Sequence, residues 1–169
     1  MNSLPCFGIA GWKNSGKTSL AAALITEFTK RGMKVSTIKH AHHSFDLDNE
    51  GTDSFKHRVS GAQEVVLVSQ NRWAIQHELQ GKPEPTFADM LSKISPCDLV
   101  LVEGYKREPI PKIEIIGPDL HKELLWKNDK NIKAIACDTQ VAGCDLPQFG
   151  RQETTDIANF ILSFLRIKL

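Results

Sequence analysis

The sequence predicts an α/β fold with a mostly parallel sheet. Along the 169 residues, short apolar runs of strand length alternate with segments whose apolar residues recur at helical spacing. The run at 98–104, DLVLVEG, is continuously apolar, which is typical of a central strand covered on both faces. The length is that of one domain. We therefore expect a single domain over 1–169.

The first elements have clear boundaries. Residues 5–11 predict a short apolar strand. A helix is expected from Thr18, because Leu20, Leu24 and Phe28 recur four residues apart, and Gly32 is suited to end it. We expect the later elements in this order: a strand at 33–40, a polar loop at 41–52, a helix at 53–60, strands at 64–69 and 72–79, a helix from Thr86 through Ile94, strands at 98–104, 112–116 and 132–138, and a C-terminal helix marked by Ile157, Phe160, Ile161, Phe164 and Leu165. The segment at 64–78 is the part expected to be antiparallel.

Composition excludes several classes of protein. A formal net charge of +1 gives no electrostatic basis for a general nucleic-acid binder. No apolar run approaches membrane-spanning length, and no signal segment opens the chain. The four cysteines form no C-x-x-C pair, which favours reduced, structural thiols. We expect a soluble cytoplasmic protein without nucleic-acid or membrane partners.

The stretch FGIAGWKNSGKTSL, at 7–20, contains the phosphate-binding spelling Gly11-x-x-x-x-Gly16-Lys17-Thr18, known as Walker A. Glycines let successive backbone N–H groups point at a phosphate, and the helix that follows adds its positive end. In such loops the lysine bridges terminal phosphate oxygens and the hydroxyl of the next residue ligates Mg²⁺. The strand before and the helix after the motif predict a P-loop NTPase-like three-layer sandwich, and a single nucleotide-binding domain over 1–169. Further donors are expected from Asn14, Ser15, Gly16 and Ser19.

A second element of this kind of site is an acid at the end of a neighbouring strand. Glu103 ends the run at 98–104, and Gly104 after it would let the chain pass close to a terminal phosphate. Alone, such a carboxylate would only mark where a buried strand meets solvent. Together with the loop, it predicts a Mg²⁺ shell formed by Thr18 and Glu103.

The polar stretch KHAHHSFDLD, at 39–48, has three interpretations. It is a metal site, a loop of solvated side chains, or a nucleotide-sensing segment such as those that follow the second strand of many nucleotide-binding proteins. The spacing matches no fixed zinc signature. The candidate ligands for the metal interpretation are His40, His42, His43, Asp46 and Asp48.

The roles of two further charged residues remain open. Arg58 either contacts phosphates or is a surface cation. Asp138, at the end of a predicted strand, accepts the two N–H groups of a guanine or forms a turn with Thr139. The common guanine-binding pattern Asn-Lys-x-Asp is absent, so the residues alone leave GTP and ATP both open.

Five stretches in order, GWKNSGKTSL, IKHAHHSFDLD, GTDSFKHRVSGA, SQNRWA and LVEGYKREPIPKI, resemble the molybdopterin-guanine-dinucleotide biosynthesis adaptor (MobB) family. The resemblance extends from residue 7 to about 113. It implies a homodimeric GTP-binding protein that assists the molybdopterin guanylyltransferase and hydrolyses GTP weakly or only with a partner. It further implies GTP at Lys13 to Ser19, Mg²⁺ near Thr18 and Glu103, and a role for His40 and the loop after it. Molybdopterin itself is a further candidate partner.

Two alternatives belong to other classes of protein. One is a small-molecule kinase on the same fold, which needs an acceptor pocket and a basic lid. The region after the third strand carries only Arg72 and Lys82, which disfavours it. The other is a metal-delivery GTPase in which the block from His40 to His43 carries the metal.

Overall fold

The structure is a computed structural model that describes residues 4–41, 45–118 and 123–168. Two compact units divide the chain. The larger unit comprises Met1–His40 and Phe87–Leu169, and the smaller unit is Ala41–Thr86. The single nucleotide-binding domain predicted over 1–169 stays a prediction beside this division. No helix among the described residues is long and apolar enough to cross a membrane.

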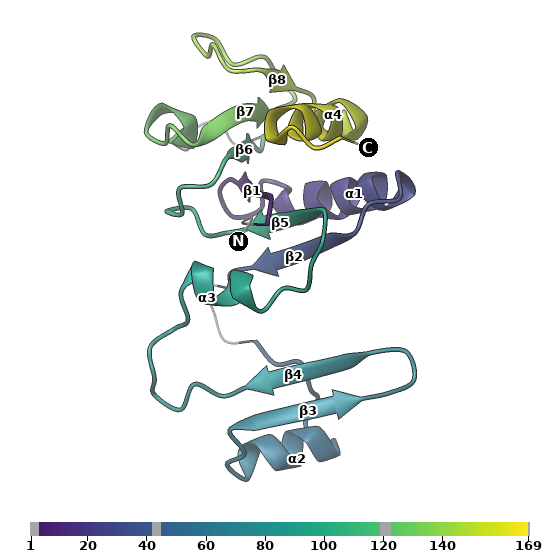
Figure 1. Ribbon diagram of the computed structural model, residues 1–169. Helices are drawn as coiled ribbons and strands as arrows, with labels where there is room; N and C mark the ends of the chain where they lie inside the picture. Colours follow the sequence, from purple (N-terminus) through teal and green to yellow (C-terminus); the bar gives the residue numbers. More distant parts are fainter. Residues whose placement is uncertain (1–3, 42–44, 119–122, 169) are drawn as a thin grey trace. The chain divides into compact units, whose positions relative to one another are not determined.

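A six-stranded sheet forms the centre of the larger unit, with the strand order β2-β5-β1-β6-β7-β8 (Figure 1). Every neighbouring pair is parallel. The strands are β1 (Cys6–Ala10), β2 (Val35–Lys39), β5 (Leu99–Glu103), β6 (Lys112–Ile115), β7 (Ile132–Ala136) and β8 (Gln148–Phe149). Because parallel strands end at the same edge, the residues after β1, β5, β6, β7 and β8 all meet along one edge of the sheet.

Helices lie on both faces of this sheet, as the apolar run at 98–104 predicts. In β5, Leu99 and Leu101 join one buried cluster, whereas Val100 and Val102 join another on the opposite face. The first face is covered by α1 (Lys17–Lys30) and α4 (Thr154–Leu165), and the second by α3 (Phe87–Ser92). The predicted three-layer α/β arrangement is therefore confirmed.

Helix α1 buries the three residues that predict it, Leu20, Leu24 and Phe28. Its contact with α4 is fixed by a hydrogen bond of 2.7 Å in which Arg31 Nη1 donates to Asn159 Oδ1. The ring of Phe7, at the centre of the sheet, meets Phe160 and Phe164 of α4 edge to face. These contacts hold α4 against the C-terminal end of α1 and against β1.

The smaller unit contains α2 (Asp53–Val59) and an antiparallel pair, β3 (Glu64–Val68) and β4 (Trp73–His77). The predicted antiparallel portion is thus confirmed. Thr52 caps α2 by accepting a hydrogen bond from the backbone N–H of Phe55.

Two short elements have no clear pattern in the sequence. They are the 3₁₀ turn η1 (Leu125–Lys127) and β8. The turn is held by Glu114, a buried acid of β6 that accepts hydrogen bonds from the backbone N–H groups of Leu125 and Trp126 at 2.9 and 2.8 Å. The turn therefore depends on one buried carboxylate from β6, and no repeated pattern in the sequence predicts it.

Candidate functional site

The loop after β1 has a backbone that glycine alone allows at its two ends. Gly11 has φ +149°, and a Cβ there would lie 2.5 Å from the carbonyl oxygen of Ile115. Gly16 has φ +102° and is the N-cap of α1, and Asn14 between them has φ +65°. These conformations are strained or blocked for most residues. The glycine spacing of the motif is therefore required by the shape of the loop.

The start of α1 is suited to an anion. The first N–H groups of a helix have no partners within it, and the helix dipole makes this end positive. No acidic residue occupies the first turn of α1. Several predicted phosphate-contacting residues of the loop are exposed to solvent, namely Lys13, Asn14, Thr18 and Ser19.

Lys17 is held against its own loop, because its Nζ donates to the carbonyl oxygen of Trp12 at 2.7 Å. Burial lowers the pKa of Lys17, Glu103 opposes this shift, and Lys106 and Lys39 add to it. Lys106 also lies over the Trp12 ring, 4.4 Å from its centre. Lys17, Lys39 and Lys106 thus share this region with two acids, Glu103 and Glu114, and the excess of positive charge suits a polyphosphate.

Thr18 and Glu103 are in direct contact. The Thr18 hydroxyl donates to Glu103 Oε1 at 2.9 Å, and Lys39 Nζ lies 3.6 Å from the same oxygen. A hydroxyl and a carboxylate are hard oxygen donors of the kind that Mg²⁺ prefers. The two residues predicted to hold Mg²⁺ therefore lie together, and their donor set fits that ion.

His40 and Gly104 meet at the ends of β2 and β5. A Cβ at Gly104, where φ is +91°, would lie 2.9 Å from the Cβ of His40. The backbone N–H of His40 donates to the carbonyl oxygen of Glu103, and its ring centre lies 4.8 Å from that of Tyr105. The glycine is thus needed for His40 to pack next to the acid.

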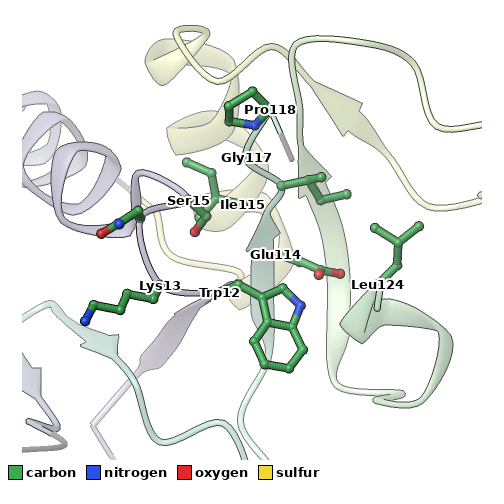
Figure 2. Close-up of a pocket in the computed structure, with 10 residues that line it drawn as sticks. Trp12, Lys13, Ser15, Glu114, Ile115, Gly117, Pro118 and Leu124 are labelled. Carbon is green, nitrogen blue, oxygen red and sulfur yellow. The ribbon is translucent and has the colours of Figure 1, made fainter. Parts of the chain in front are cut away.

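A cavity of about 260 Å³ lies between the loop after β1 and the end of β6 (Figure 2). The loop residues Trp12 and Ser15 line it from one side and Leu124 from the other, with Glu114 between them. Ser15 is 4% exposed, and its hydroxyl oxygen has no hydrogen-bond partner. The loop therefore carries an unsatisfied polar atom, as expected where a ligand completes the site.

Asp138 follows β7 and pairs with Arg151, which follows β8. This hydrogen bond and the charge of the guanidinium lower the pKa of the Asp138 carboxyl. Arg151 also reaches the loop after β1, where its Nη1 donates to the carbonyl oxygen of Ser15 at 3.4 Å. No pattern in the sequence marks Arg151, because only the packing of β8 beside β7 brings it to the loop.

The remaining predicted residues belong to the smaller unit. Arg58 makes ion pairs with Asp46 at 3.1 Å and Asp48 at 2.8 Å, so its contact with phosphates stays a prediction. His42 and His43 lie outside the described residues. Within the described ranges, no group of three or more His, Cys, Asp or Glu side chains is placed to hold a metal ion.

The family model described as molybdopterin guanine dinucleotide synthesis protein B matches residues 6–138. The chain is 38% identical over 167 residues to the molybdopterin-guanine dinucleotide biosynthesis adapter protein of Haemophilus influenzae, covering 97% of this chain and 91% of the relative. It is 31% identical to the protein of the same name from Escherichia coli, covering 96% and 94%.

Solved structures agree with this similarity. A crystal structure of molybdopterin-guanine biosynthesis protein B has a TM-score of 0.73 at 27% identity, covering 94% of this chain and 99% of that one. The MobB structure from Bacillus subtilis has a TM-score of 0.74 at 21% identity, covering 98% and 100%, and shows a common fold.

Proposed function

The chain belongs to the molybdopterin guanine dinucleotide synthesis protein B family, and from this we propose that it is a GTP-binding adapter in the synthesis of that dinucleotide. In this role it holds GTP and Mg²⁺ at the loop after β1 and assists the guanylyltransferase that joins GMP to molybdopterin. The proposal places it in the cytoplasm, in keeping with four cysteines that are all unpaired.

The observation that carries the proposal is the contact between Thr18 and Glu103 beside Lys17. A phosphate loop needs a cation for the terminal phosphates and a metal ligand on each of two elements. Here Lys17 and Thr18 open α1, and Glu103 comes from the neighbouring strand β5, 2.9 Å from the Thr18 hydroxyl. Thr18 and Glu103 would hold Mg²⁺, which would supply positive charge beside the terminal phosphates.

We propose slow or partner-stimulated hydrolysis. In this proposal the described residues of the site bind and orient the nucleotide. Lys17 neutralises phosphate charge, while Thr18 and Glu103 hold the metal. A group that orients water is a separate requirement of fast hydrolysis. In our proposal this group comes from the partner or is absent, and the nucleotide is held for use by the guanylyltransferase.

We also propose that the adapter is a homodimer joined through the antiparallel pair of the smaller unit. One face of this pair carries Val66 opposite Ile75 and Val68 opposite Trp73. These four side chains are 50–77% exposed. An exposed apolar face on a small sheet is a typical protein interaction surface. A second copy of the chain offers the same face, as a twofold dimer requires.

The adapter role is tested with purified guanylyltransferase and molybdopterin at limiting GTP. We expect the rate of dinucleotide formation to rise when the wild-type chain is added, and to rise much less with Lys17→Ala. An equal stimulation by both proteins would contradict a role for the phosphate loop. No stimulation by the wild type would contradict the adapter role itself.

A further inference from the structure

The ion pair between Asp138 and Arg151 lies on the nucleotide-binding edge of the sheet. Asp138 is the second residue after β7 and Arg151 the second after β8, so both stand at the carboxyl ends of parallel strands. Arg151 Nη1 contacts the carbonyl oxygen of Ser15 and lies 3.7 Å from the position of a Cβ on Gly16. The pair is therefore packed against the phosphate loop.

The direction of a bound nucleotide follows from the metal side of the loop. Thr18, Glu103 and Lys39 lie towards β5 and β2, on one side of β1. Terminal phosphates and Mg²⁺ belong there. The rest of the nucleotide then extends in the opposite direction along the edge, over β6, β7 and β8. Asp138 and Arg151 are the charged side chains paired at the ends of β7 and β8 on that side.

We infer that Asp138 and Arg151 together form a guanine-reading pair that distinguishes GTP from ATP. This inference rests on the proposed binding of a nucleotide at the loop. In this pair, an acid from the end of β7 and a base from the end of β8 take the place of the missing Asn-Lys-x-Asp pattern.

The chemistry of the pair matches the edge of guanine. That edge presents two donors, the 2-amino group and N1–H, followed by one acceptor, O6. The two Asp138 oxygens accept from both donors, and an Arg151 N–H donates to O6, as arginine does to guanine in DNA. Adenine presents an acceptor at N1 and a donor at its 6-amino group, so it opposes both side chains.

A purely structural ion pair would not need these features. Asp138 is half exposed, with 53% of its side chain accessible, which leaves room for a base. Arg151 is 24% exposed, and its Nε is buried without a hydrogen-bond partner. The guanidinium is thus held in place by Ser15 and Asp138 while one donor is left unsatisfied. Exposed ion pairs contribute little to stability, so a recognition role explains the arrangement better.

The test is a set of equilibrium titrations of GTP, ATP and inorganic tripolyphosphate, each with Mg²⁺. The proteins are the wild type, Arg151→Ala, Arg151→Lys and the control Arg72→Ala, an exposed arginine of the smaller unit. We expect Arg151→Ala to lose about tenfold or more in GTP affinity. Its affinity for tripolyphosphate should stay within about twofold of wild type, since this anion makes no base contact, and its affinity for ATP should not fall, since Arg151 opposes adenine. Arg151→Lys should lose less, and the control should behave as wild type.

A second variant tests the acid. Asp138→Asn should bind GTP more weakly and xanthosine triphosphate more strongly than wild type, because an amide donates to the 2-oxo group where the carboxylate accepts from a 2-amino group. This exchange of preference is not expected from loss of structure.

The outcomes separate the inference from the proposed function. If wild type binds tripolyphosphate and both nucleotides equally, or if Arg151→Ala keeps the wild-type ratio of GTP to ATP affinity, the guanine-reading pair is refuted while the phosphate site stands. If Arg151→Ala weakens tripolyphosphate as much as GTP, Arg151 serves the phosphates instead of the base. If wild type binds none of the three, the proposed function fails, and this inference with it.

Discussion

The hydroxyl of Thr18 lies 2.9 Å from Oε1 of Glu103, a residue 85 positions away in the sequence. The contact joins the first turn of α1 to the end of β5, the strand beside β1. A bond between neutral hydroxyl and carboxylate can give way to a shared cation, because both oxygens remain acceptors. The account of this protein as a GTP–Mg²⁺ adapter depends on that exchange.

Replacing Glu103 with Gln tests the metal role. The amide keeps the size of the side chain but removes its charge, so we expect Mg²⁺-dependent GTP affinity to fall about tenfold or more. Affinity in EDTA should change little. Titration of both proteins under both conditions measures this, with the exposed Glu50→Gln as control. Equal Mg²⁺ dependence in Glu103→Gln and wild type would contradict the assignment.

The buried lysine of β6 gives a prediction for stability. Lys112 is 1% exposed, and its Nζ donates to Asp129 Oδ2 at 3.0 Å and to the carbonyl oxygen of Glu108 at 2.6 Å. Asp129→Ala leaves this charge without its counter-ion. We expect the variant to lose about 2 kcal/mol of unfolding free energy. This is less than the 3–5 kcal/mol lost when a fully buried pair is broken, because Asp129 is partly exposed. Lys112→Met removes the charge and should cost less.

Urea unfolding of the two variants measures that difference. Lys133→Met, on the neighbouring strand β7, is the matched control and should be close to wild type. A larger loss for Lys112→Met than for Asp129→Ala would mean that packing of the lysine stem, and not its charge, dominates at this position.

Glu114 predicts a dependence of stability on pH. Burial raises its pKa above the ordinary 4.5, and the N–H groups of Leu125 and Trp126 partly oppose this. Between 4.5 and the raised value, the folded state therefore binds more protons than the unfolded state, so its contribution to stability falls as pH rises. We expect the unfolding free energy of wild type, relative to Glu114→Gln, to decrease across this window.

Denaturant titrations of wild type and Glu114→Gln measure this difference at several pH values from about 4 to 7, a range that begins near the ordinary carboxyl pKa. The titration of all other groups is common to both proteins and cancels in the comparison. A difference that grows with pH would show that the two backbone N–H groups outweigh burial and lower the pKa of Glu114.

The exposed face of the antiparallel pair predicts the state of association. Lysines at Val68 and Trp73 place charge in the proposed dimer interface, where burial without a partner is unfavourable. We expect the double variant Val68→Lys, Trp73→Lys to sediment as a monomer while wild type sediments as a dimer. Val59→Lys, at an exposed position of α2, is the control. A wild-type monomer would refute the dimer, and a dimeric double variant would place the interface elsewhere.

Much of this architecture follows from local patterns. The spacing of Leu20, Leu24 and Phe28 predicts α1, and the run at 98–104 predicts a central strand, because each element buries its own apolar face. The loop after β1 follows from its motif, since Gly11 and Gly16 are needed for its backbone. Glu103 follows from its position at a strand end.

Other parts of the site depend on packing between distant segments. Arg151 stands in a polar stretch with no motif, and reaches Ser15 only because β8 pairs with β7. The turn η1 exists because Glu114 of β6 binds its N–H groups. Lys106 reaches the Trp12 ring through a loop that has no periodic pattern. Such contacts between segments leave no spacing that a single sequence reveals.

The most direct test of the central claim is a calorimetric titration of GTP into the wild-type protein and into Lys17→Ala, with Mg²⁺ and with EDTA. The account predicts saturable binding of GTP to the wild type that weakens in EDTA and is lost in Lys17→Ala. Binding that survives Lys17→Ala, or a wild-type protein that binds ATP and not GTP, would contradict it.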